Sequence, residues 1–192
     1  MSKGKPEIAI SACLLGQRVR YDGEDKRQSQ IVDFFLEQFS EQVSIIPFCP
    51  EVAIGLGVPR PKIQLIRQKG EQIRVLGVEN HTLDVTESLQ SYADEFLTQY
   101  PGLSHVIVKS RSPSCGYQST PLMMNILGDS DNDNEVEPQS KDIYKQIALS
   151  SGLFVQTILA IKPELQIVDE TQLITQQQCL KFLQSMQQEK NT

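Results

Sequence analysis

The residues best suited to chemistry are three cysteines that each follow a predicted buried strand and stand close to Gly or Pro. They are Cys13 after the apolar run 7–12, Cys49 after 42–48, and Cys115 after 103–109. None forms a Cys-x-x-Cys pair, which excludes the local patterns of zinc ribbons, thioredoxins and ferredoxins. Because ligands bind beyond the carboxyl ends of parallel strands, the three thiols can converge in one crevice.

A metal centre is a natural reason to gather three thiolates, because thiolates alone repel one another. Thiolate ligands select zinc, copper(I) or iron–sulfur clusters, and three protein ligands leave one coordination position open for chemistry. The alternative is three unrelated core cysteines, since free cysteine is often buried. Basic residues outnumber acidic ones by eight to four in 13–27, 49–62 and 109–116. This local positive charge suits thiolates and an anionic centre or substrate.

The fourth cysteine, Cys179, has a different context. It shares helical spacing with Phe182, Leu183 and Met186, which indicates one apolar face of a helix. We therefore interpret Cys179 as a small apolar residue of the core, separate from the other three thiols.

Composition limits the class of protein. The chain has 192 residues, of which 39% are hydrophobic and 22% charged, and this predicts one globular domain over 1–192. The net charge of −6 and the absence of Trp argue against DNA and membrane-surface partners. No apolar run reaches the ~18 residues of a membrane helix. The run before Cys13 is too short for a signal peptide, so we expect a cytoplasmic protein with reduced thiols.

The elements that must position the cysteines alternate between strands and helices. The predicted strands are 7–12, 42–48, 103–109 and 165–168, and the predicted helices are 31–39, 85–100, 143–161 and 171–188. Gly152 marks a point at which the helix over 143–161 can break. Ranges 62–67 and 72–76 predict a small β-hairpin, and the acidic stretch 127–139 predicts a loop insertion. We expect an α/β fold, a single-domain three-layer sandwich with a mainly parallel, Rossmann-like sheet.

Three motifs in this order resemble those of the family first catalogued as domain of unknown function 523. They are Ser11-Ala12-Cys13-Leu14-Leu15-Gly16 with Val19–Gly23, Cys49-Pro50-Glu51-Val52 with Pro59-Arg60, and Lys109-Ser110-Arg111-Ser112-Pro113-Ser114-Cys115-Gly116. The likeness extends over most of residues 7–175. The characterised activity of that family is 2-thiouracil desulfuration. The resemblance implies an α/β fold and an oxygen-sensitive [4Fe-4S] cluster held by only three cysteines, here Cys13, Cys49 and Cys115.

The resemblance also implies an enzyme that desulfurates a thiolated pyrimidine such as 2-thiouracil without net redox change, giving uracil and hydrosulfide. The iron without a protein ligand would take the thiocarbonyl sulfur, and water would replace it. A carboxylate and a hydroxyl would move the protons. We expect Glu51 to be the acid/base and Ser112 the hydroxyl, with Ser114 as the alternative to Ser112.

The expected substrate-binding residues are Arg20, Tyr21, Asp22 and Ser114. Asp22-Gly23 fits an ordinary turn equally well. The acidic insertion and the tail after about residue 176 are longer than short family members have, and they can alter access to the site or mediate assembly. Family members also differ in domain context, so a thiolated pyrimidine, a thiolated nucleoside or another thioamide-like compound fits the same chemistry. The oligomeric state is not indicated.

Two other functions use the same residues. A redox sensor would lose a cluster from the three cysteines on oxidation and change its partner binding, without catalysis. A cysteine hydrolase would use Cys115 or Cys49 as its nucleophile and would need a positioned histidine. His81 and His105 are both distant from the cysteines in sequence, which disfavours the hydrolase.

Overall fold

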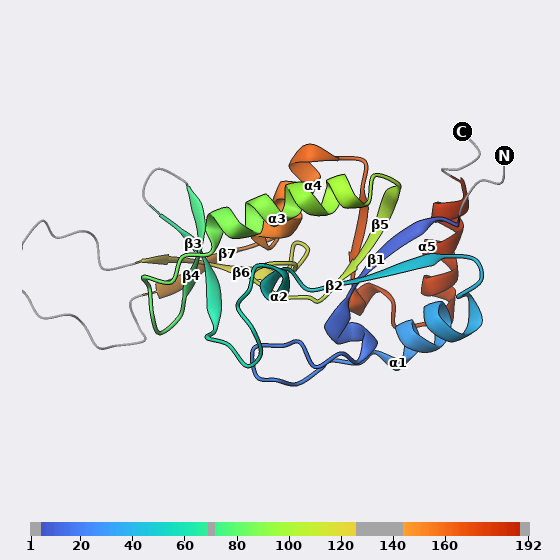
Figure 1. Ribbon diagram of the computed structural model, residues 1–192, viewed down its shortest axis with the longest axis horizontal. Helices are drawn as coiled ribbons and strands as arrows, with labels where there is room; N and C mark the ends of the chain where they lie inside the picture. The colour runs from blue at the N-terminus through green and yellow to red at the C-terminus, as the bar shows by residue number, and fades with distance from the viewer. Residues whose placement is uncertain (1–4, 69–71, 126–143, 189–192) are drawn as a thin grey trace, which may run out of the picture.

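The computed structural model describes residues 5–68, 72–125 and 144–188 and contains two four-stranded sheets (Figure 1). The first sheet has the order β2-β1-β5-β8 with all strands parallel. Its strands are β1 (Glu7–Ser11), β2 (Ser44–Phe48), β5 (Leu103–Val108) and β8 (Gln166–Asp169). All four match predicted strands within two residues, which confirms the parallel α/β fold.

Helices cover both faces of this first sheet. One face carries α1 (Ser29–Ile31), the π-helical segment η2 (Val32–Gln38) and α5 (Gln176–Gln188), and the other carries α3 (Thr86–Gln99) and α4 (Leu153–Ile161). Side chains alternate across β1 accordingly: Ile8 packs with Phe35 on the first face, whereas Ala9 packs with Phe96 on the second. The three-layer arrangement is therefore present around this sheet.

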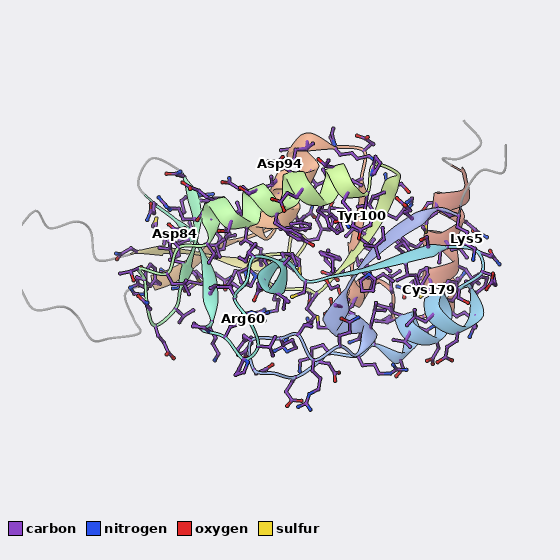
Figure 2. All side chains as sticks on the ribbon, in the orientation of Figure 1. Lys5, Arg60, Asp84, Asp94, Tyr100 and Cys179 are labelled. Atoms are coloured by element: carbon purple, nitrogen blue, oxygen red, sulfur yellow. The ribbon has the colours of Figure 1, made fainter. Side chains whose placement is uncertain are left out.

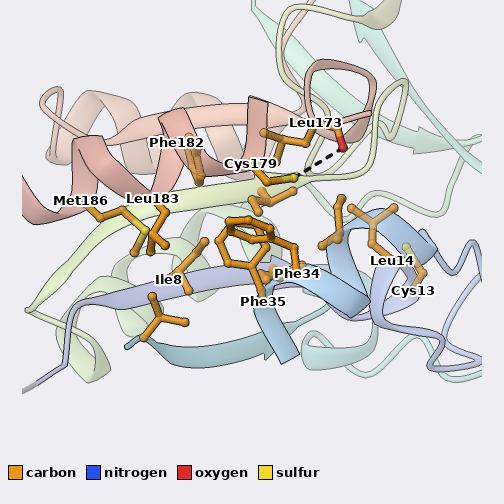
Figure 3. Packing of buried hydrophobic residues seen from close by; sticks show 14 residues of the cluster. Ile8, Cys13, Leu14, Phe34, Phe35, Leu173, Cys179, Phe182, Leu183 and Met186 are labelled. Carbon is orange, nitrogen blue, oxygen red and sulfur yellow. Dashed lines mark hydrogen bonds between the residues drawn. The ribbon is translucent and has the colours of Figure 1, made fainter. Parts of the chain in front are cut away.

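Cys179 lies in the first of these cores, as its helical spacing predicts. It is fully buried on α5 beside Phe182 and Leu183, and its thiol points toward the carbonyl oxygen of Leu173 at 3.8 Å (Figure 3). The same cluster reaches Cys13 at its far end.

The second sheet has the order β4-β3-β6-β7. Its strands are β3 (Ile63–Arg67), β4 (Ile73–Gly77), β6 (Thr120–Asn125) and β7 (Tyr144–Ser150). β3 and β4 form the predicted antiparallel hairpin, β6 adds to β3 in parallel, and β7 pairs with β6 in the antiparallel sense. The predicted helix over 143–161 is wrong in its first half. Pairing with β6 makes that half a strand, and α4 begins only after Gly152, whose extended backbone separates the two.

The remaining elements are short and follow strands directly. They are η1 (Ala12–Leu15), α2 (Pro50–Ala53) and η4 (Glu170–Gln172). The predicted C-terminal helix 171–188 is accordingly divided into η4 and α5. The predicted acidic insertion 127–139 lies outside the described residues. Within the described ranges, no helix combines the length and apolar character needed to cross a membrane.

Candidate active site

The carboxyl ends of β1, β2 and β5 surround a cavity of about 510 Å³. Cys13 enters it from η1, Cys49 from the junction of β2 and α2, and Cys115 from the loop after β5. The structure thus brings these three cysteines to one cavity, while Cys179 stays in the core. The parallel sheet explains this, because its strands all end at the same edge.

The three thiols influence one another through charge. Burial raises the pKa of Cys13 to about 12, and the neighbouring Cys115 and Cys49 add to this rise by like-charge repulsion. Burial likewise raises the pKa of Cys49 to about 11 and raises that of Cys115. Arg20 and Lys109 lower the pKa of Cys13, and Arg60 lowers that of Cys49, but burial outweighs these cations. A further cationic centre between the thiols would favour their thiolate forms. In the described part of the chain, no three His, Cys, Asp or Glu side chains meet as ligands of a single metal ion.

Glu51 lies in the first turn of α2 and is held by a buried arginine. Arg60 donates from Nε to Glu51 Oε2 at 2.8 Å, and the two side chains are only 3% and 12% exposed. Arg60 Nη1 also donates to the carbonyl oxygens of Val19 at 2.8 Å and Gly57 at 3.0 Å. Its Nη2 lies 3.9 Å from Cys49 Sγ. Figure 2 labels this arginine beside α2. The guanidinium therefore fixes one oxygen of the carboxylate and joins two loops.

The other oxygen of Glu51 begins a chain of hydroxyl groups. Ser114 Oγ donates to Glu51 Oε1 at 2.7 Å, and Ser112 Oγ lies 3.1 Å from Ser114 Oγ. Ser114 uses its proton on Glu51, so Ser112 must donate to Ser114. Ser112 Oγ in turn accepts from the backbone N–H of Cys115 at 3.2 Å. The hydroxyl in contact with the carboxylate is that of Ser114, and Ser112 stands one step farther along.

The loop that carries these serines and Cys115 is seated on the beginning of α4. The N–H groups of Gly152, Leu153 and Phe154 donate to loop carbonyl oxygens at 2.8, 3.0 and 3.0 Å. A Cβ on Gly152 would lie 2.4 Å from the carbonyl carbon of Ser114, so only glycine fits there. Helix N–H groups that usually lack partners thus fix the loop.

Lys109 lines the cavity and is anchored by a residue that the sequence did not single out. Glu170, which is 7% exposed, accepts from Lys109 Nζ at 2.5 Å, from the Ser110 N–H at 2.6 Å and from Ser110 Oγ at 2.8 Å. Burial alone would raise the pKa of Glu170, but these hydrogen bonds lower it below its usual range. The one available sequence signal was its place at the end of the last parallel strand.

The expected substrate-binding residues divide into two groups. Arg20, Tyr21 and Ser114 line the cavity. Asp22 is not among the lining residues, and its two carboxylate oxygens accept from Arg20 Nε at 3.2 Å and Nη2 at 3.1 Å. Arg20 and Lys62 each lie 5.2 Å from the centre of the Tyr21 ring. Asp22 thus orients Arg20, and two cations contact the ring of Tyr21.

A family model and a solved structure resemble this chain in sequence and fold. Residues 8–170 match the family model for 2-thiouracil desulfurase. The solved structure of a [4Fe-4S]-dependent thiouracil desulfidase resembles the chain with a TM-score of 0.59 and 28% identity, covering 92% of this chain and 99% of that one. No curated protein matches the chain. The matched residues include every part of the cavity described above.

Proposed function

This chain belongs to the 2-thiouracil desulfurase family, and from that premise we propose that it desulfurates a thiolated pyrimidine such as 2-thiouracil at a [4Fe-4S] cluster. Cys13, Cys49 and Cys115 converge on one cavity beside the buried carboxylate of Glu51, and this arrangement is the main support for the proposal. The products would be uracil and hydrosulfide. One water oxygen replaces the sulfur, one proton of that water leaves with the sulfur as hydrosulfide and the other passes to solvent, so no external oxidant or reductant is needed.

The residues present fit such a cluster. The three cysteines supply soft donors. Burial and, secondarily, like-charge repulsion oppose their thiolate forms, and a positively charged core would offset both. The three thiols line one cavity of about 510 Å³, which leaves room for an inorganic core of several atoms. Cys13, Cys49 and Cys115 would hold it, and when bound it would supply a Lewis-acidic iron, open to the sulfur of the substrate.

Proton handling falls to Glu51 and the two serines. The carboxylate, which Arg60 holds in position, would take a proton from the attacking water. The hydroxyl chain runs from Ser112 through Ser114 to Glu51, so a proton can pass along it between the carboxylate and a ring nitrogen. Arg20 and Tyr21 line the same cavity and would hold the pyrimidine.

The ligand assignment is tested by anaerobic purification and analysis of iron and labile sulfide. We expect about four of each per chain, the content of one [4Fe-4S] cluster. Cys13→Ser, Cys49→Ser and Cys115→Ser should each lose the iron. Cys179→Ser is the matched control and should keep it, because that thiol is buried in the helix core. Full iron in any of the first three variants would remove that cysteine from the site.

The catalytic assignment is tested by hydrosulfide release from 2-thiouracil. Glu51→Gln, Ser112→Ala and Ser114→Ala should keep the iron and lower kcat by roughly 10²-fold or more, because each breaks the same proton path. The double variant Ser112→Ala/Ser114→Ala should be no slower than the slower single one, as for groups that act as a unit. Thr98→Ala, which removes an exposed hydroxyl on α3, is the control. A loaded protein that releases no hydrosulfide would instead favour a redox sensor.

A further inference from the structure

Ser11 is a buried hydroxyl residue to which the proposed function gives no role. It ends β1 and is only 2% exposed. Its Oγ lies 3.1 Å from the backbone nitrogen of Lys109, which donates to it, and 3.5 Å from Cys115 Sγ. Ser11 therefore stands between the end of β5 and one of the three thiols.

The direction of the hydrogen bond to sulfur follows from these two contacts. The Lys109 N–H occupies an acceptor position of the Ser11 oxygen, so the hydroxyl proton remains for another acceptor. Cys115 Sγ is at hydrogen-bond distance, and in its thiolate form it can only accept. The hydroxyl therefore donates to the sulfur once Cys115 has lost its proton.

Cys49 has a different environment. Its Sγ lies 3.8 Å from the carbonyl oxygen of Val19 and 3.9 Å from Arg60 Nη2. Arg60 is already committed to Glu51 and to two carbonyl oxygens at 2.8–3.0 Å. The side chains of both Ser112 and Ser11 contact the Cys115 thiol. Ser112 belongs to the hydroxyl chain that ends at Glu51, whereas removal of the buried Ser11 hydroxyl leaves that chain intact.

We propose that Ser11 is a positioning residue that donates a hydrogen bond to the Cys115 thiolate and thereby tunes the cluster. This inference rests on the proposed function, since it requires Cys115 to be a cluster ligand. A hydrogen bond to a ligand sulfur withdraws electron density from the irons. The cluster becomes easier to reduce, and its open iron becomes a stronger acceptor for sulfur.

The test is the reduction potential of the cluster, which a merely structural role would not move. Parent, Ser11→Ala and Ser11→Thr proteins are prepared anaerobically, matched for iron content and titrated with dithionite while the reduced cluster is followed by EPR. Ser11→Ala should shift the midpoint to a more negative potential, and Ser11→Thr, which keeps the hydroxyl, should restore it toward the parent value. Thr86→Val is the matched control. Thr86 is also buried, at 5% exposed, and its hydroxyl also accepts a backbone N–H, that of Val75 at 2.9 Å, but it joins α3 to β4. It should leave the midpoint unchanged.

A second measurement covers the case in which Ser11→Ala fails to fold or to load. In the parent protein, resonance Raman bands of the Fe–S(Cys) stretches should shift in D₂O, because the bond from Ser11 carries an exchangeable proton, and Ser11→Thr should retain this shift. An unchanged midpoint in fully loaded Ser11→Ala, or the absence of a D₂O shift in the parent, overturns the role of Ser11 and leaves the desulfurase proposal standing. Full iron content in Cys115→Ser would overturn the ligand assignment and this inference with it.

Discussion

Arg60 connects several segments of the site through its side chain and its backbone. Its guanidinium contacts the carboxylate of Glu51 and the carbonyl oxygens of Val19 and Gly57, and its own backbone N–H donates to Tyr21. Because the ion pair is buried, removing one partner leaves the other charge without compensation. The planar fork of arginine reaches several acceptors at once, which lysine cannot do.

We predict that Arg60→Gln lowers kcat by roughly 10²-fold, because Glu51 loses the contact that orients it. The free energy of unfolding should fall by about 3 kcal/mol, the usual cost of breaking a buried ion pair. Arg60→Lys should recover part of the stability but little of kcat. Iron content, hydrosulfide release and urea unfolding measure these effects. Arg18→Gln, which removes an exposed arginine paired with Glu24, is the control. Equal activity of Arg60→Gln and Arg18→Gln would contradict the role given to Arg60.

The elements of the first sheet were predictable because each strand is a short buried apolar run and each long helix has a clear apolar face. The second sheet was only half predictable. β6 contains Pro121, and a proline normally argues against a strand. The residues of β7 are mostly exposed and lack the apolar–polar alternation that marks a half-buried strand. Both strands depend on pairing between segments, which local patterns do not record.

His105 connects β5 to α5 and makes this contact sensitive to pH. Its Nδ1 lies 2.8 Å from Ser104 Oγ, and its Nε2 lies 3.0 Å from Ser185 Oγ. The centre of its ring lies 5.0 Å from the centre of the Phe182 ring. Burial lowers the pKa of His105 from 6.5 to about 4. The folded protein therefore holds the neutral ring over a pH range in which the unfolded chain binds a proton.

Stability should consequently fall as the pH is lowered from about 6.5 to about 4. The loss from this residue amounts to about 3 kcal/mol, since one pKa unit corresponds to ~1.4 kcal/mol. Urea unfolding of the parent and of His105→Gln over this range checks the prediction, because the difference between the two curves isolates the histidine. Parallel curves would show that His105 does not titrate in this way.

On the scale of the whole molecule, the site depends on strand order more than on any local motif. β1 lies between β2 and β5, so the three cysteine-bearing ends are neighbours although they are far apart in sequence. The parallel topology made this convergence predictable from the sequence. The supporting contacts of Arg60, Glu170 and Ser11 were not, because each joins segments whose proximity only the folded chain reveals. α3 and α4 pack against both sheets, which supports the proposal that the chain forms one domain.

A cluster bound at these three ends should stabilise the whole protein, because it binds the native state and not the unfolded chain. We predict that removing the iron with a chelator lowers the midpoint of thermal unfolding, followed anaerobically by circular dichroism. Cys115→Ser should melt like the iron-free parent whether or not the chelator is added. Cys179→Ser should still show the difference between the loaded and iron-free forms. Identical midpoints for loaded and iron-free parent protein would mean that no such link between the strand ends exists.

The close fit of Gly152 against the Ser114 peptide also bears on how the protein matures. A chain leaving the ribosome presents Cys13 and Cys49 early, but the seat for the third thiol is not complete until residues 152–154 have been made and have captured the loop. Until then the third thiol is present in the nascent chain, but its loop lacks the contacts that hold it in place. We therefore expect the inorganic cofactor to be inserted after folding, and chains truncated before α4 to accumulate without it.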